Sequence, residues 1–396
     1  MAKTVCNTNM CTACMACVDI CPKSAIVIKD SLKHENAIID ETKCIACGMC
    51  EKVCQIVKPL PLKESIKWFQ GWNNAPAERQ KSSSGAFAYG LAKQVINEGG
   101  YVAACRFEKG EFRYSIAKDV DELTLFRESK YVKSNPIGIF KSVKKLLVQG
   151  LFVLFIGLPC HVAAMKKYLG RDYGNLITVD LICHGSPSPK LLELFLQQYE
   201  ISLETIKSIH FRQKGSFRLT GENVSKNTER KEISFTQPGI RDRYSIAFLY
   251  GLIYTENCYY CPYARIDRVS DITIGDSWGS EIGEEEMDKG VSLALCQTEK
   301  GINLVERSPL KLFDVNLDKA MDANHQLREP YPIPKNRDNF FRAIEKNISF
   351  NNAVKKSFPR ACFRLDVKDF LFKTGLLKIN GGGVIDSCIY RITIEE

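Results

Sequence analysis

Apolar positions along the chain follow helical spacing in some stretches and strand spacing in others. Two short stretches near the amino terminus, 25–29 and 37–40, read as a pair of strands. Apolar residues at helical spacing begin at Phe87, and two glycines, Gly99 and Gly100, end the segment, so we expect a helix there. Beyond residue 334 the pattern becomes helical and basic. The chain is therefore expected to begin with a small β-containing region and to end in helices.

The middle of the chain holds two successive units with the pattern strand, turn, helix. The apolar stretch 151–156 runs into Gly157-Leu-Pro-Cys-His161, and 176–182 runs into Cys183-His-Gly-Ser-Pro187. Two such units in succession predict a parallel α/β core. Other expected elements are strands at 101–107, 111–116, 271–274, 292–298 and 311–315, a mixed β region from 206 to 235, and helices at 138–149, 189–199, 244–254 and 301–307.

Cysteine spacing identifies the chemistry of the amino-terminal region. Eight of the 17 cysteines lie within the first 54 residues, in two copies of C-x2-C-x2-C-x3-C. This is the run by which bacterial ferredoxins hold two [4Fe–4S] clusters, and the fourth cysteine of each copy ligates the other cluster. We therefore expect one cluster on Cys11, Cys14, Cys17 and Cys54, and a second on Cys44, Cys47, Cys50 and Cys21.

Two other readings of these cysteines are less favoured. A structural zinc site usually pairs two C-x2-C knuckles rather than triplets. A disulfide framework suits a small secreted domain and not a chain of 396 residues. Cys6 lies just outside the repeat and is expected to be a free thiol.

Four further cysteines occur in turns of the predicted core. Cys160 and Cys183 follow the two successive strands, and Cys258 and Cys261 form one C-x2-C knuckle. If the two strands are neighbours, their ends lie close together, because strands in a sheet are about 4.8 Å apart. A knuckle folded over that edge would complete a set of four thiolates for a third [4Fe–4S] cluster. The same four residues would also suit zinc, or be ordinary buried cysteines, as we expect of Cys105, Cys296, Cys362 and Cys388.

Composition narrows the class of protein. The chain is 45% hydrophobic and 26% charged, as in ordinary globular proteins of two or three domains. No apolar run approaches the roughly 20 residues of a membrane span, and cluster cysteines begin almost at once, so we expect a cytoplasmic protein without membrane contact. Three clusters of about −2 each would lower the formal charge from +9 to about +3, and we expect no nucleic-acid partner.

Several segments together resemble the beta subunits of coenzyme F420-reducing hydrogenase and formate dehydrogenase. They occur in the family's order between residues 65 and 315, and the amino-terminal cysteine repeat precedes them. In two places the chain departs from the family pattern, since Leu158 and His161 stand where threonine and glutamine are expected. The segments are Ser82–Gly85, Ser129–Ser134, Gly157–Cys160, Asp180–Gly185, Phe211–Lys214, Cys258–Cys261 and Ser270–Trp278.

The resemblance implies a noncovalently bound FAD beside the core iron–sulfur cluster. Under it, Ser82, Ser83, Ser84 and Gly85 would open a helix whose amino terminus suits a pyrophosphate. Lys130 would hold negative charge on the flavin, and Tyr131 would border its ring; their alternatives are a solvated lysine and core packing. Ser134 belongs to the same segment. Asp276 and Trp278 would shape the pocket, and His161 and His184 would donate protons or only bond cluster sulfur or backbone.

We therefore expect an α+β fold. Residues 1–58 would form a small ferredoxin-like dicluster domain, 65–330 a mixed α/β flavin-binding core with the probable third cluster, and 335–396 a helical C-terminal extension. The expected function is FAD-dependent electron transfer from ferredoxin or another low-potential carrier to coenzyme F420 or an unidentified small substrate. The alternatives are an electron-transfer subunit that feeds a catalytic partner protein, and a cluster-bearing structural or sensor protein without flavin.

Overall fold

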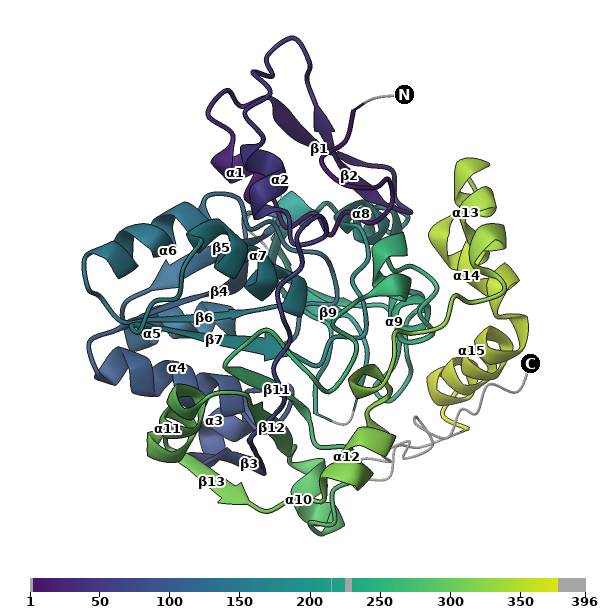
Figure 1. The fold of residues 1–396 in the computed structure, drawn as a ribbon. Coiled ribbons are helices and arrows are strands. Elements are labelled where there is room, and N and C mark those ends of the chain that lie inside the picture. The colour runs from purple at the N-terminus through teal and green to yellow at the C-terminus, as the bar shows by residue number, and fades with distance from the viewer. Residues whose placement is uncertain (1–2, 215, 225–229, 377–396) are drawn as a thin grey trace.

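A computed structural model describes residues 3–214, 216–224 and 230–376. The amino-terminal region contains one antiparallel strand pair and two short helices, one after each cysteine triplet (Figure 1). The strand pair lies where the sequence predicts it. These elements are β1 (Ile26–Asp30), β2 (Glu35–Ile39), α1 (Ala16–Ile20) and α2 (Met49–Val53).

The core is built on one mixed sheet of eight strands in the order β13-β3-β12-β11-β7-β6-β4-β5. The four strands β11, β7, β6 and β4 are parallel to one another, and the flanking pairs are antiparallel. The fold is thus α+β with a large mixed sheet. The bounds are β3 (Lys67–Asn73), β4 (Tyr101–Glu108), β5 (Glu111–Ala117), β6 (Val153–Gly157), β7 (Leu176–Leu181), β11 (Ile272–Asp276), β12 (Ser292–Cys296) and β13 (Leu310–Phe313).

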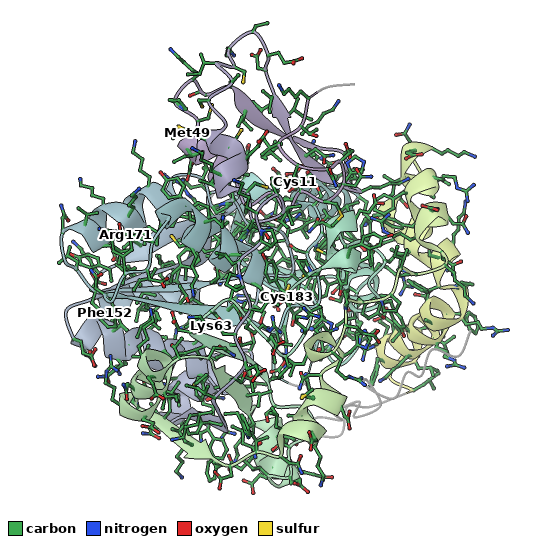
Figure 2. The ribbon with its side chains drawn as sticks, in the orientation of Figure 1. Cys11, Met49, Lys63, Phe152, Arg171 and Cys183 are labelled. Carbon is green, nitrogen blue, oxygen red and sulfur yellow. The ribbon has the colours of Figure 1, made fainter. Side chains whose placement is uncertain are left out.

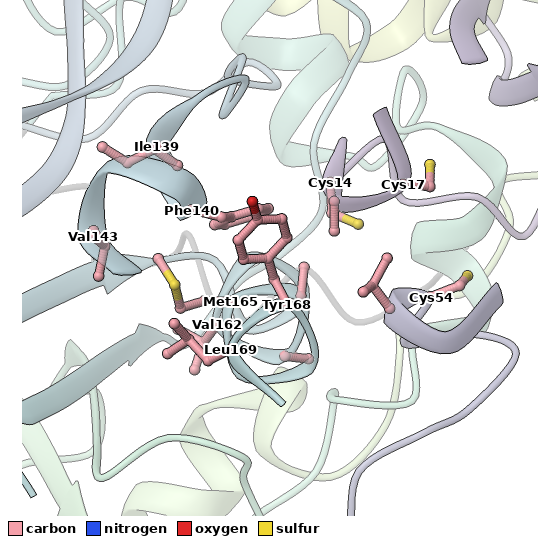
Figure 3. Close-up of a cluster of buried hydrophobic side chains, with 14 of the residues drawn as sticks. Cys14, Cys17, Cys54, Ile139, Phe140, Val143, Val162, Met165, Tyr168 and Leu169 are labelled. Carbon is pink, nitrogen blue, oxygen red and sulfur yellow. The ribbon is translucent and has the colours of Figure 1, made fainter. Parts of the chain in front are cut away.

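Helices cover both faces of this sheet (Figure 1). On one face α4 (Phe87–Asn97) and α11 (Glu299–Arg307) pack on β4, β6, β7 and β11. On the other face α6 (Ile139–Val148) and α7 (Pro159–Leu169) pack on β6, and the amino-terminal region rests on them. Figure 3 shows Cys14, Cys17 and Cys54 beside the apolar side chains of these two helices. The first cysteine set is therefore anchored to the core.

A second apolar core joins the middle of the chain to its carboxyl-terminal helices. Phe195 and Tyr244 are buried together with Phe340 and Phe350, so the last helices are part of a packed core. The elements are α8 (Pro189–Gln197), β8 (Ile206–His210), β9 (Thr220–Val224), β10 (Arg230–Ser234), α9 (Arg243–Leu249), α13 (Arg337–Glu345), α14 (Phe350–Ser357) and α15 (Pro359–Lys373). Residues 377–396, which include Cys388 and the end of the expected extension, lie outside the described residues.

Short connecting elements complete the structure. Within the described ranges every helix is too short or too polar to cross a bilayer. The remaining elements are α3 (Pro76–Gln80), α5 (Val120–Leu123), η1 (Thr124–Phe126), η2 (Leu203–Thr205), η3 (Glu256–Tyr260), α10 (Glu284–Asp288), α12 (Leu317–Ala323) and η4 (His325–Leu327).

The sequence prediction missed one strand of the main sheet and extended one helix too far. Strand β3 follows a proline-rich linker and pairs with β12 and β13, more than 200 residues away along the chain. Helix α9 ends at Leu249 and not near residue 254, because Tyr250 is its C-cap and Gly251 takes a left-handed φ of 64°. The other strands and helices agree with the expected ranges within a few residues.

Candidate cluster and cofactor sites

The two cysteine triplets fold into loops of the same shape. Ala13 and Ala46 both have a φ of 52°, and each backbone N–H donates to the sulfur of the cysteine two residues earlier, at 3.4 Å. Left-handed φ values also occur just before both helices, at Met15 and Gly48. A chain that turns back in this way carries its cysteines around one centre. The repeat in sequence is therefore a repeat in backbone conformation.

The first set of cysteines surrounds one small cavity. Its lining includes all four residues expected for the first cluster and also Cys6. The four are Cys11, Cys14, Cys17 and Cys54, and all are buried. The fourth member comes from the second repeat, as the exchange of ligands between repeats requires.

The second set lies nearer the surface. Cys47 is exposed, and Cys21, Cys44 and Cys50 are partly buried. The backbone N–H of Ala25 donates to the Cys21 sulfur at 3.3 Å. The two amino-terminal sites thus differ in their exposure to solvent, and exposure is one determinant of cluster potential and stability.

None of the cysteines in the described residues forms a disulfide. The same residues contain no group of three or more His, Cys, Asp or Glu side chains arranged for a single metal ion. Ligands of one tetrahedral zinc–sulfur site are about 4 Å apart, whereas the thiolates of a four-iron cluster bind different corners of a cube and stand farther apart. That result concerns a single zinc ion and not a cluster.

The four core cysteines line one cavity beneath the amino-terminal region. Strands β6 and β7 are parallel neighbours, with Gly157 opposite Asp180, so the turns that follow them carry Cys160 and Cys183 to the same edge. The knuckle of Cys258 and Cys261, on η3, closes over this edge. Burial raises the pKa of Cys183 to about 12 and that of Cys261 to about 11, and the neighbouring thiols add to both rises. The predicted quartet is therefore assembled.

This core cysteine cavity adjoins the first amino-terminal site. Met10, Thr12 and Ile56 from the amino-terminal region line the core cysteine cavity, and two of them, Thr12 and Ile56, also line the cavity of the first cysteine set. Figure 2 labels Cys11 and Cys183, one from each site. The two cysteine sets are thus separated by a thin wall of side chains.

A larger cavity of about 330 Å³ lies on the other side of the core cysteines. It falls in the range of small-molecule and cofactor sites, about 300–1,000 Å³. Its wall toward the core cysteine cavity is shared, because the same five residues line both. These are Leu158, Cys183, His184, Gly185 and Ser186.

Most residues expected to bind a cofactor line this large cavity. Gly85 does not: a Cβ at this position would be 2.6 Å from the carbonyl oxygen of Gly71, so glycine permits close packing against β3. The first residues of helix α4, Ala86 to Tyr89, also line the cavity, and a helix amino terminus offers free N–H groups to an anion. The expected residues that line it are Ser82, Ser83, Ser84, Lys130, Tyr131, Ser134, Asp276 and Trp278.

The side chains of these residues are engaged in the fold as well. The Lys130 ammonium donates to the backbone carbonyl oxygens of Phe126 and Glu128, at 2.9 and 3.0 Å, so it stabilises the turn after η1. Tyr131 stacks on Phe248 with ring centroids 4.3 Å apart. Neither contact prevents a ligand from touching the exposed edge of the side chain. The alternatives of a solvated Lys130 and a packed Tyr131 are thus partly realised, since Lys130 is buried by local bonds and Tyr131 belongs to an aromatic cluster.

The two candidate histidines occupy different positions. His184 lines both cavities, and its Nδ1 lies 2.9 Å from Nε2 of Gln326. His161 is fully buried, lines only the core cysteine cavity, and bonds through Nδ1 to the Tyr114 hydroxyl at 2.9 Å. Burial lowers the pKa of His161 to about 3 and that of His184 to about 4, so both rings are neutral at pH 7.

Sequence reasoning missed two cationic residues at these cavities. Arg212 lines the large cavity and donates to Asp276 Oδ2 at 2.5 Å. It belongs to the segment 211–214 that carries the family resemblance, so a signal was present. Lys133 lies in the segment 129–134 and lines the core cysteine cavity, but its neighbour Lys130 drew the assignment. Nothing local in the sequence tells which of the two lysines faces the cysteines.

Comparison with known proteins agrees with this arrangement. Residues 152–311 match the C terminus of the coenzyme F420 hydrogenase/dehydrogenase beta subunit, and residues 10–56 match the 4Fe-4S dicluster domain. One subunit of the F(420)H(2) dehydrogenase of Methanosarcina mazei is 22% identical over 308 residues, which cover 71% of this chain and 82% of that protein.

Two further matches are more limited. An uncharacterized ferredoxin of Methanocaldococcus jannaschii is 48% identical over 40 residues, 10% of this chain and 24% of its own length. A chain of the F420-reducing [NiFe] hydrogenase complex from Methanosarcina barkeri, solved after xenon derivatization, is 16% identical with a TM-score of 0.41 over 72% of this chain and 95% of its own. On the family matches, this chain belongs to the family of coenzyme F420 hydrogenase/dehydrogenase beta subunits and carries an amino-terminal 4Fe-4S dicluster domain.

Proposed function

We propose that this chain is an iron–sulfur flavoprotein oxidoreductase. It would exchange electrons with ferredoxin or a similar low-potential carrier and reduce coenzyme F420 or another small substrate. The family makes it an iron–sulfur electron-transfer protein related to the F420 hydrogenase and dehydrogenase subunits. The observation that carries the finer proposal is the shared wall between the core cysteine cavity and the large cavity.

The core cysteine cavity suits a third [4Fe–4S] cluster. Its four sulfur ligands come from three separate segments, and burial keeps each away from bulk water. A buried cation, Lys133, lies in the same lining and would offset part of the negative charge of four thiolates. The ligands would be Cys160, Cys183, Cys258 and Cys261.

The large cavity suits FAD. Its apolar side chains would accommodate a flat ring system, while the amino terminus of α4 and the adjacent serines would face a pyrophosphate. Two cations, Arg127 and Arg212, are also in the lining. When bound, a flavin supplies the step between one-electron and two-electron transfer that clusters cannot perform alone. We keep Ser82, Ser83, Ser84, Lys130, Tyr131, Ser134, Asp276 and Trp278 as binding residues, and assign Gly85 to backbone packing.

The histidines would handle protons from different sides. His184 is the better placed for a substrate, because it borders the large cavity and its Nε2 is not used by Gln326. His161 lies on the cluster side, and its Nε2 has no hydrogen-bond partner within the described residues. We propose that His184 holds the proton exchanged with substrate and that His161 faces cluster sulfur.

The residue ranges 1–58, 65–330 and 335–396 remain our proposal for the domains. A second function, that of a subunit which passes electrons to a catalytic partner protein and has no substrate of its own, is favoured by the relative from Methanosarcina mazei, which is itself named a subunit. The two functions share the same cofactors and differ only in what reoxidises the protein.

Anaerobic purification with iron, sulfide and flavin assays tests the cofactors. We expect about 12 iron atoms and one FAD per chain, the sum of three four-iron clusters and one flavin site. Cys258→Ala should lower iron to about 8 atoms, whereas Cys296→Ala, a buried cysteine of β12 that lines neither cavity, should leave iron unchanged. About 8 iron atoms in the unmodified protein, or no extractable flavin, would refute the proposal.

Reoxidation separates the two functions. The protein is reduced with dithionite, the excess is removed, and coenzyme F420 or a pool of small metabolites is added. Recovery of the oxidised flavin absorbance supports an enzyme with its own substrate. Recovery only on addition of a partner protein supports the role of a subunit that feeds such a partner.

A further inference from the structure

Lys133 is a buried cation at the junction of the amino-terminal region and the core. Its side chain is 5% exposed, and that of its ion-pair partner, Glu35 on β2, is 7% exposed. The ammonium lies 3.5 Å from Glu35 Oε2 and donates to the Thr255 hydroxyl oxygen at 2.9 Å. A lysine so deeply buried is unusual unless it is paired.

The surroundings of Lys133 contain sulfur on two sides. It lines the core cysteine cavity, and the thiols whose charge it affects are Cys160 and Cys258 of the core and Cys11 of the first amino-terminal set. Its partner Thr255 lies with its hydroxyl 3.6 Å from the sulfur of Cys258. Lys133 therefore stands between two expected cluster sites and beside ligands of both.

Glu35 offsets this charge only in part. Burial disfavours the ammonium, but Glu35 and the nearby thiols outweigh it and raise the pKa of Lys133. Burial also raises the pKa of Glu35, and Lys133 limits that rise. With one carboxylate against one ammonium, the pair is a dipole whose positive end lies in the lining of the core cysteine cavity. A charge held in a poorly solvated site acts more strongly than one in water.

Reduction adds one negative charge to a cluster that already carries about −2 with its thiolates. A fixed positive charge nearby stabilises the reduced form and raises the reduction potential. We propose that Lys133 is a tuning residue that raises the potentials of the core cluster and the first amino-terminal cluster, and that Glu35 opposes it. The inference rests on the third cluster of the proposed function. Its role is to set the direction in which an electron moves between these two neighbours.

Potentiometric titration followed by electron paramagnetic resonance tests this inference in the intact protein. In Lys133→Gln we expect the core cluster and the first amino-terminal cluster to shift to lower potential, with the reduced fraction at fixed potential falling about tenfold, or about 59 mV for a one-electron couple. Glu35→Gln should shift both upward, because it removes the opposing charge. Lys133→Arg keeps the charge and should stay near the unmodified protein.

The second amino-terminal cluster is an internal control. Lys133 is not among the groups that affect the thiol of Cys50, one of its expected ligands. Its potential should therefore stay constant in all three variants. Shifts of opposite sign in the two charge-removing variants, confined to the two neighbouring clusters, support the inference, because misfolding cannot raise one potential and lower the other.

Other outcomes are equally decisive. Unchanged potentials in Glu35→Gln, or equal shifts in all three clusters, would overturn the tuning role. If Lys133→Gln loses iron, Glu35→Gln decides alone: an upward shift supports the inference and no shift refutes it. About 8 iron atoms in the unmodified protein would instead refute the third cluster, so the two failures are distinguishable.

Discussion

The Tyr114 hydroxyl and Nδ1 of His161 lie 2.9 Å apart and join the walls of two cavities. Tyr114, on β5, lines the large cavity, whereas His161, on α7, lines the core cysteine cavity. The two rings also meet edge to face, with centroids 5.3 Å apart. This pair holds the first turn of α7, which carries Cys160, against the strand beside the large cavity. A change on one side can thus affect the other.

Removing this hydrogen bond should cost stability. In Tyr114→Phe the fully buried His161 loses its Nδ1 partner, so we expect the free energy of unfolding to fall by about 2 kcal/mol. Anaerobic denaturant unfolding followed by circular dichroism measures the change. Tyr168→Phe is the control, because the Tyr168 hydroxyl makes no hydrogen bond among the described residues. Equal losses in both variants would contradict the prediction.

Gly185 lies in the wall shared by the two cavities and tolerates no side chain. Its φ is +145°, and a Cβ would overlap the buried ring of Tyr254. We expect Gly185→Ala to lose about 3 kcal/mol of stability and part of its iron. Gly174→Ala, where a Cβ meets nothing within 4 Å, should remain within about 0.5 kcal/mol. A stable Gly185→Ala protein with full iron would show that this wall can move.

Filling the large cavity at the amino terminus of α4 should exclude the flavin without touching the cysteines. Ala88 lines the cavity and is only partly buried, so the fold has room for a larger residue there. We expect Ala88→Trp to keep about 12 iron atoms per chain and to lose most extractable flavin. Asn97→Trp, exposed at the other end of the same helix, should keep both. Full flavin content in Ala88→Trp would place the flavin elsewhere.

The exposed side of the second amino-terminal site is the expected entry for electrons from a carrier protein. Cys47 is exposed, and Ile45 beside it is 58% exposed. Replacing an apolar contact by a carboxylate should weaken docking, so we expect Ile45→Asp to slow reduction by ferredoxin about fivefold.

Reduction of the Ile45→Asp variant by dithionite should be unchanged, because this small reductant needs no docking surface. Val148→Asp, also exposed but at the end of α6, serves as the position control. Stopped-flow absorbance measures all four rates. A normal rate with ferredoxin in Ile45→Asp would show that the carrier docks at another face.

Local sequence patterns predicted the elements that carry the cysteines. The triplets are readable because their ligands lie within seven residues of one another, and the strand–turn–helix units are readable because an apolar strand and its turn are contiguous. Strand β3 was not readable in this way. Gly71 interrupts its pattern, and it becomes a strand by pairing with β12 and β13 from the far end of the core.

The identity of the thiol ligands, their division into two repeats and the order of the elements were thus determined by sequence alone. The tertiary structure decided which other groups stand beside those thiols. Lys133 rather than Lys130 lines the core cysteine cavity, Glu35 approaches it from a separate region of the chain, and Gly85 packs against a strand and not on a ligand. The physical reason is distance along the chain: ligand spacing is local, whereas burial and charge at a site are set by segments that meet only when the chain has packed.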